Sequence, residues 1–179
     1  PGAMIGFYQK LGGIAYYEED FEKGYQYFMK TLELAEQYLE EEQIGDYNLN
    51  AGLCLMALER HEEADSHFIK AIQIFESLGL QHWVARVYHN LAKSSLTAKN
   101  LEKFESYFEK ILEMYEILGD NSRKGDLLNE YSVVYLGRHE CDKAQSLAAH
   151  ALSIFIEEKE KQAKAYINLA GALIGLEEF

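Results

Sequence analysis

One spacing recurs along the chain and constrains its fold more than any other feature. Four segments share this spacing, and they begin at residues 24, 64, 104 and 144, so three successive intervals are each 40 residues. The segments are Gly24-x-x-x-Phe28-x-x-Thr31, Ala64-x-x-x-Phe68-x-x-Ala71, Phe104-x-x-x-Phe108-x-x-Ile111 and Ala144-x-x-x-Ala148-x-x-Ala151. A fixed period of this length indicates stacked copies of one supersecondary unit.

A second pattern lies upstream of each of these segments. Its copies are Tyr8-x-x-Leu11-Gly12, Asn48-x-x-Ala51-Gly52, Tyr88-x-x-Leu91-Ala92, Leu128-x-x-Tyr131-Ser132 and Tyr166-x-x-Leu169-Ala170. Positions i, i+3 and i+4 form one stripe of an amphipathic helix, so each unit is predicted to be a hairpin of two helices. The small residue that ends each copy lets the two helices of a hairpin approach closely.

The proline content supports an all-α fold. Pro1 is the only proline, and a chain without internal proline suits long uninterrupted helices. We interpret residues 1–4 as a cloning scar and residues 5–179 as a single array. The predicted hairpins span about 5–40, 44–77, 82–117 and 121–158, and 161–176 is the first helix of a fifth. Because 176–179 resemble the start of a second helix, we expect the parent protein to continue.

Composition excludes several classes of function. The formal net charge of −13 repels phosphate backbones, so we expect no nucleic-acid binding. No stretch reaches the roughly 18 apolar residues that a membrane span needs, and we expect no membrane association. Cys54 and Cys141 form no disulfide framework or metal pair, which favours a reducing, cytoplasmic location. Phosphate-loop, zinc-protease and hydrolase motifs are absent from the sequence, so we expect no enzymatic activity, no cofactor and no metal.

The repeated phrases resemble those of the tetratricopeptide repeat family over residues 5–179. Tyr8-Gln-Lys-Leu11-Gly12, followed by Asp20-Phe21-Glu-Lys-Gly24 and Phe28, is similar to the family's consensus. The units depart from it in length, 40 residues against the usual ~34, and they lack a helix-ending proline. Long units of this kind resemble those of bacterial peptide-pheromone receptors and transcriptional regulators. The resemblance implies a right-handed α-solenoid whose concave groove is lined by the first helix of each hairpin.

Asparagine recurs at the groove positions that the resemblance implies. The residues concerned are Asn50, Asn90 and Asn168, immediately before the Leu11-type position, and Asn129, one place earlier in its unit. An amide offers both a donor and an acceptor, which suits it to hold the backbone of an extended peptide. The other candidate groove residues are Arg86, His89, Lys93, Lys10 and Tyr17. The alternative interpretation is a solvated polar face with no ligand.

The functional hypothesis is an interaction module that binds a protein or an extended peptide. We expect it to be the regulatory part of a larger bacterial regulator. The alternative is a structural scaffold or oligomerisation domain without a peptide groove. An apolar strip of Tyr166, Leu169, Ala170 and Leu173, predicted to lack a partner helix, leads us to expect a homo-oligomer through this end.

Overall fold

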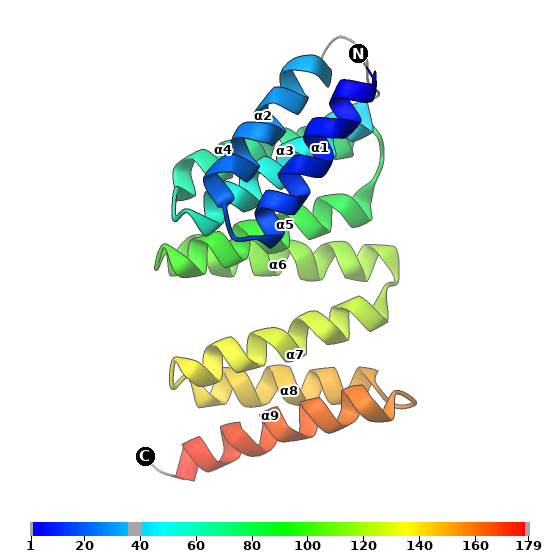
Figure 1. Ribbon diagram of the computed structural model, residues 1–179. Coiled ribbons are helices and arrows are strands. Elements are labelled where there is room, and N and C mark those ends of the chain that lie inside the picture. The colour runs from blue at the N-terminus through cyan, green and yellow to red at the C-terminus, as the bar shows by residue number, and fades with distance from the viewer. Residues whose placement is uncertain (1, 36–40, 178–179) are drawn as a thin grey trace. The chain divides into compact units, whose positions relative to one another are not determined.

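The computed structural model describes residues 2–35 and 41–177, and these fold into nine helices joined by short turns (Figure 1). The helices are α1 (Gly2–Tyr17), α2 (Phe21–Ala35), α3 (Glu41–Ala57), α4 (His61–Ser77), α5 (Gln81–Thr97), α6 (Leu101–Leu118), α7 (Asn121–Gly137), α8 (Cys141–Ile154) and α9 (Lys159–Glu177). The predicted all-α class is confirmed, with antiparallel helices in repeats. None of the described helices is both long and apolar enough to cross a membrane.

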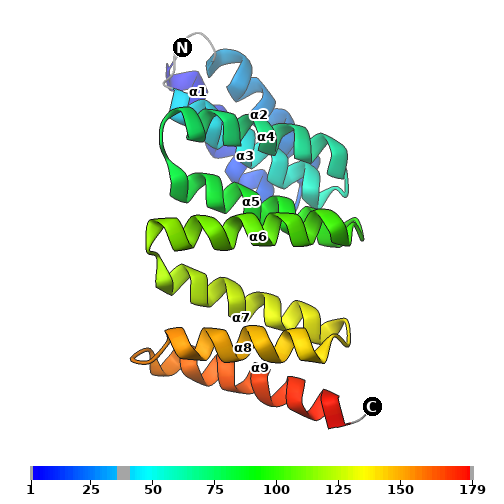
Figure 2. The same ribbon diagram turned by 180° about the vertical axis from the view of Figure 1, so that it is seen from behind.

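The chain divides into two compact units, residues 1–111 and 112–179. In the first unit α1 packs on α2 and α3 on α4, while α2 also contacts α3 and α4 contacts α5. In the second unit α8 packs on α7 and on α9, and α7 also contacts α9 (Figure 2). Within each unit, the second helix of one hairpin therefore packs on the first helix of the next hairpin.

The turns repeat with the same period as the helices. Glu19, Glu59, Lys99 and His139, which are 40 residues apart, all have φ between 58° and 61°. At the first of these turns the N–H of Asp20 donates to the carbonyl of Ala15 at 2.9 Å, a bond that closes the end of the helix. The connections between hairpins use Gly79 and Gly119, at φ 70° and 65°, as the Leu-Gly pairs predict.

In each of the first two hairpins a glycine of the first helix lies against a phenylalanine of the second. A Cβ atom on Gly12 would lie 2.9 Å from Cε1 of Phe28, and one on Gly52 would lie 2.6 Å from Cε1 of Phe68. Both rings are buried, with 4% and 0% of their surface exposed. The predicted role of the small residues is confirmed at these two positions, because each leaves room for a ring of the partner helix.

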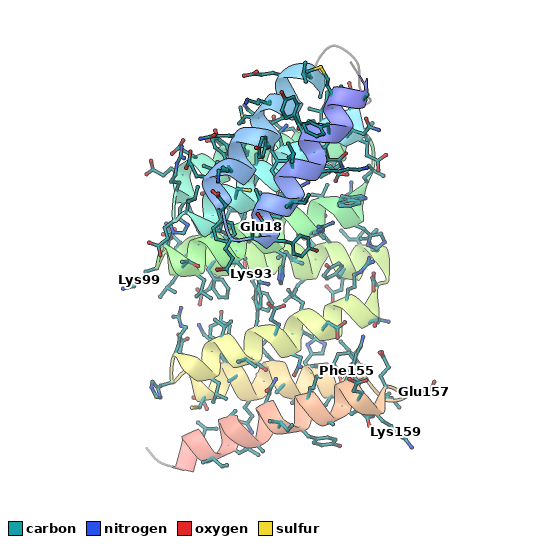
Figure 3. The ribbon with its side chains drawn as sticks, in the orientation of Figure 1. Glu18, Lys93, Lys99, Phe155, Glu157 and Lys159 are labelled. Carbon is teal, nitrogen blue, oxygen red and sulfur yellow. The ribbon has the colours of Figure 1, made fainter. Side chains whose placement is uncertain are left out.

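A second glycine–phenylalanine contact, which the sequence pattern does not predict, recurs two repeats apart near the ends of α4 and α8. A Cβ on Gly45 would meet Cε1 of Phe75 at 2.7 Å, and one on Gly125 would meet Cε1 of Phe155 at 2.6 Å, which is the same contact two repeats later. The prediction of helix to residue 158 is wrong, because α8 ends at Ile154. Figure 3 labels Phe155, which directly follows α8, Glu157 on the connection, and Lys159, the first residue of α9.

The other predicted bounds agree with the described helices to within three residues at most ends. The first helix begins at Gly2, three residues before the predicted start at residue 5. The predicted end of the second helix at residue 40 lies outside the described residues.

Candidate functional site

The first unit contains a cavity of about 350 Å³. Three of the candidate residues, Tyr17, Asn50 and Arg86, line it together with five others: Gln9, Gly13, Tyr16, Phe28 and Leu53. These side chains come from α1, α2, α3 and α5, which are brought together by the packing of the first hairpins. The first helix of each hairpin supplies most of the lining, as the resemblance implies for a groove.

Arg86 is exposed on α5, and its guanidinium lies over the ring of Trp83. Its guanidinium carbon is 4.8 Å from the centre of the Trp83 ring, and that ring stacks on Phe75 with centroids 5.5 Å apart. The positive charge of Arg86 acts on Asp46 of α3. Burial raises the pKa of the Asp46 carboxyl, and the Arg86 guanidinium opposes part of that rise. Among the described residues, however, no carboxylate oxygen lies within 4 Å of the guanidinium.

The amides of the first unit differ in how they are held. The hydroxyl of Tyr47 on α3 donates to Oε1 of Gln9 on α1 at 3.2 Å, which fixes the Gln9 side chain at the edge of the cavity. Asn50 and Asn90 are half-buried on α3 and α5. Neither of their side-chain amides has a hydrogen bond to another residue of the described chain. Both amides are therefore available to a ligand.

The remaining candidates of the first unit are on α1 and α5. Tyr17 is 90% exposed at the end of α1, and Lys10 is exposed one residue after Gln9. His89 is half-buried and Lys93 exposed, one and two turns along α5 from Arg86. Three of these candidates, Lys10, Arg86 and Lys93, carry a positive charge, although the whole chain is acidic.

The second unit brings the other two asparagines into direct contact. Nδ2 of Asn168 on α9 donates to Oδ1 of Asn129 on α7 at 2.7 Å, and to the Asn129 carbonyl at 3.2 Å. The sequence predicts both residues as ligand contacts, and the structure shows that they also bridge two helices of the protein itself. The sequence spacing does not predict this hydrogen bond, because the bond depends on how closely α7 and α9 pack.

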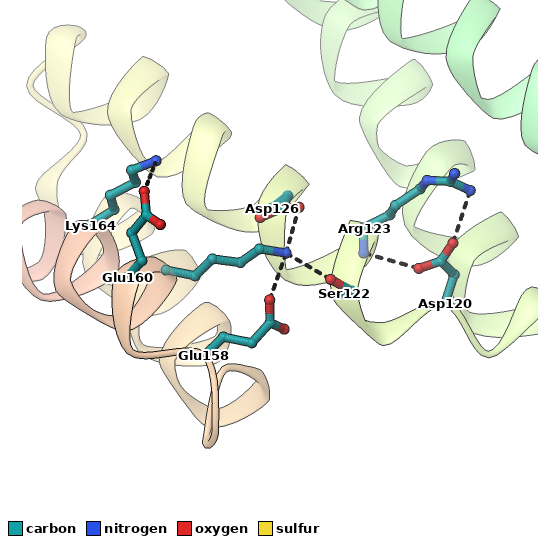
Figure 4. Close-up of polar contacts among 8 residues, drawn as sticks. Asp120, Ser122, Arg123, Asp126, Glu158, Glu160 and Lys164 are labelled. Atoms are coloured by element: carbon teal, nitrogen blue, oxygen red, sulfur yellow. Dashed lines mark hydrogen bonds and ion pairs between the residues drawn. The ribbon is translucent and has the colours of Figure 1, made fainter.

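A lysine-centred cluster holds the start of α9 against α7 in the same unit (Figure 4). The Lys161 amino group lies 3.0 Å from carboxylate oxygens of both Asp126 and Glu158, and donates to the Ser122 hydroxyl at 2.7 Å. The side chain of Lys161 is 28% exposed and that of Asp126 55% exposed, so we assign the cluster a structural role.

Reactive and metal-binding groups do not gather in the described part of the chain. No cluster of three or more His, Cys, Asp and Glu side chains in residues 2–35 and 41–177 is arranged to hold a metal ion. Cys54 and Cys141 are free thiols and both are buried. Burial raises the pKa of the Cys54 thiol to about 12, which keeps it protonated at neutral pH.

Comparison with known families identifies the repeats. Residues 43–117 match the tetratricopeptide repeat family. This segment consists of tetratricopeptide repeats. The matched segment includes α4, α5 and Arg86 of the cavity. Comparison with curated proteins finds no significant match.

Solved tetratricopeptide repeat structures share the fold of the described helices. The apo form of RapI superposes with a TM-score of 0.84 at 14% identity, over 98% of this chain and 50% of RapI. A Rap protein complexed with Competence and Sporulation Factor gives 0.71 at 15% identity, over 97% of this chain and 53% of the other. PH0952 from Pyrococcus horikoshii, a signal transduction ATPase with numerous domains and a tetratricopeptide repeat sensor, gives 0.76 at 23% identity.

The matches cover only part of each neighbour. This chain spans about half the length of each of the two Rap proteins. The match to PH0952 covers 95% of this chain but only 27% of PH0952. At these identities the likeness concerns the fold, and the ligands of the neighbours are not thereby those of this chain.

Proposed function

We propose that this tetratricopeptide repeat protein binds an extended peptide or partner segment along the first helices of its hairpins. Asn50, Asn90, Asn129 and Asn168 would hold the peptide backbone, with Arg86, His89, Lys93, Lys10 and Tyr17 contacting its side chains. We further propose that the module is the regulatory part of a larger bacterial regulator. The described residues supply no metal cluster and the proposal involves no catalysis by them.

The observation that carries the proposal is the pair of amides at Asn50 and Asn90. Both are half-buried, 40 residues apart and without a hydrogen bond to the described chain, and Asn50 borders a cavity. A half-buried amide without a partner has lost part of its hydration, so a ligand that offers a carbonyl and an N–H gains both bonds at little further desolvation cost.

The regulatory part of the proposal draws on the neighbours. A Rap protein of the same fold forms a complex with Competence and Sporulation Factor, and PH0952 carries its repeats as a sensor within a much longer chain. A peptide-responsive role is consistent with both arrangements.

The test compares binding and stability in the same variants. In Asn90→Ala we expect peptides selected from a random library to bind more weakly by about 1–3 kcal/mol, because their polar groups lose partners. The free energy of unfolding should change by no more than about 0.5 kcal/mol. Asn121→Ala, an exposed asparagine at the start of α7, is the matched control and should change neither quantity.

Two outcomes would contradict the proposal. A lower melting temperature with unchanged affinity would make Asn90 part of the packing and favour a scaffold. Equal values for Asn90→Ala and Asn121→Ala would favour a solvated polar face.

Exposed apolar side chains on α9 support the second candidate, a scaffold that self-associates. Tyr166 is 60%, Ile167 71% and Ile174 59% exposed, at the spacing of one helix face. Of the predicted strip, Leu173 is 44% exposed and Leu169 half-buried. Light scattering at high concentration tests this candidate. A dimer that Ile167→Lys dissociates supports it, and a monomer at every concentration rules it out.

A further inference from the structure

Phe7 on α1 is exposed at a repeat position that is buried in the helices equivalent to α1. Its side chain is 58% exposed. The residues at the same position of α3, α5 and α7 are each 5% exposed or less, and they are Tyr47, Val87 and Leu127. This position therefore packs inside the array in the other repeats, and the exposed ring of Phe7 is an exception.

α9 has the same kind of exception on its own exposed face. Ala170 is exposed, whereas the small residues at its position in α1, α3, α5 and α7 are buried, namely Gly12, Gly52, Ala92 and Ser132. Leu173 is 44% exposed, against 5% or less at its equivalents Ala15, Leu55, Ser95 and Tyr135. With Tyr166 these two residues form a stripe with the 3–4 spacing of a helix-packing face.

The other repeats show what kind of side chain packs at the position of Ala170. At the equivalent Gly12 and Gly52, a phenylalanine ring of the adjacent helix lies so close that a Cβ would be 2.9 and 2.6 Å from it. Ala170 is exposed and has no such ring over it in the described chain. Phe7 is the only exposed phenylalanine in residues 2–35 and 41–177. The exposed ring and the exposed small residue therefore match each other.

Charge favours a second copy of the chain as the source of that ring. Each copy carries a formal charge of −13, so two copies repel each other over most of their surface. α9 has no charged residue from Ala165 to Leu176, and Lys10 is the only charged residue of α1. Met4 and Ile14, each 52% exposed, extend the apolar face of α1 on either side of Phe7. Two copies can meet through these helices without bringing acidic groups together.

We propose that α1 of one copy docks on α9 of a second copy, with the ring of Phe7 packed on Ala170 and flanked by Tyr166 and Leu173. Because the two faces differ, the contact is head-to-tail. The inference does not depend on the peptide groove. It goes beyond the self-association candidate by naming the surface that covers α9.

Two variants block the two faces one at a time. Phe7→Lys places a charge on the face of α1, and Ala170→Lys places one on the face of α9. Both sites are exposed, so both variants should fold. Ile69→Lys is the matched control, since Ile69 on α4 is 47% exposed and lies on neither face. By analytical ultracentrifugation the average mass of the wild type should rise with concentration above that of one chain, and Ile69→Lys should behave in the same way.

The mixture of the two variants gives the sharpest result. Each variant alone should associate about tenfold to a hundredfold more weakly than the wild type, the effect of losing one buried apolar contact. Mixed in equal amounts they should form a complex of two chains and no larger. In that complex the intact α9 of the Phe7→Lys copy holds the intact α1 of the Ala170→Lys copy, which also shows that both variants are folded.

Three results would overturn the inference. Association of either variant alone at wild-type strength is the first; if that variant is Phe7→Lys, α9 pairs with α9 and the self-association candidate stands. A mixture that stays monomeric is the second. A wild type that is monomeric at every concentration is the third, and it removes the self-association candidate as well. None of these results bears on the groove, which Asn90→Ala tests separately.

Discussion

Gly52 is the glycine of the first unit with the least room for a side chain, and this gives a quantitative prediction. Replacement of Gly52 by alanine places a Cβ 2.6 Å from Cε1 of Phe68, about 0.9 Å inside the shortest favourable carbon–carbon separation of ~3.5 Å. Phe68 is fully buried, so its ring cannot turn out into solvent. The overlap must be relieved by moving α3 away from α4.

Two opposing effects determine the size of the change. Alanine in a helix interior gains about 0.5–1 kcal/mol over glycine, and overpacking of a buried contact costs about 1–3 kcal/mol. Gly13→Ala has the first effect without the second, because a Cβ there meets nothing within 4 Å. We therefore expect Gly52→Ala to be less stable than Gly13→Ala by about 1–3 kcal/mol.

Denaturant unfolding of the two variants beside the wild type measures this difference. A double variant, Gly52→Ala with Phe68→Leu, should recover part of the loss, since the smaller side chain leaves room for the new Cβ. Equal stability of Gly52→Ala and Gly13→Ala would refute the close glycine–phenylalanine packing on which the hairpin geometry depends.

Three further results are expected. Asn168→Ala, which removes the bond to Asn129, should lower the free energy of unfolding by about 1 kcal/mol, and an unchanged denaturation midpoint would show that the bond contributes nothing. Burial lowers the pKa of His67 below its ordinary value of 6.5, so just below pH 6.5 the unfolded chain binds more protons than the folded one. The free energy of unfolding should therefore rise with pH through that window, and it should rise less steeply in His67→Gln. The Cys54 thiol, with its pKa raised to about 12 by burial, should react with a thiol reagent only on unfolding; rapid labelling of the native protein would contradict this.

The sequence predicts the helices well because they depend on a local, repeated pattern. The 40-residue period places α4, α6 and α7 within a residue of their observed bounds. It fails at α8, which ends at Ile154, and here the interval from Leu128 to Tyr166 is 38 residues rather than 40. It also gives no warning that Glu19 and its equivalents adopt positive φ, since that conformation is imposed by the joined helices rather than by residue type.

The site is predicted only in part, for a related reason. Tyr17, Asn50 and Arg86 are found by their repeat positions, and the structure brings them to one cavity. Phe28 is missed because it belongs to the second helix of its hairpin. Its ring packs against Gly12, where a side chain would leave it no room, and it also lines the cavity. The Gly12-Gly13 pair is the one sequence signal for this cavity. Gly12 alone accounts for the close packing on Phe28, and Gly13 lines the cavity.

The central claim, that the amides of Asn50 and Asn90 bind a peptide backbone, is tested most directly by nuclear magnetic resonance. A library-selected peptide is titrated into the isotope-labelled protein, and the side-chain amide signals of Asn50, Asn90 and the exposed Asn121 are followed. The account predicts that the first two shift and become protected from solvent exchange while Asn121 stays unchanged. Saturation with peptide that leaves the signals of Asn50 and Asn90 in place would contradict it.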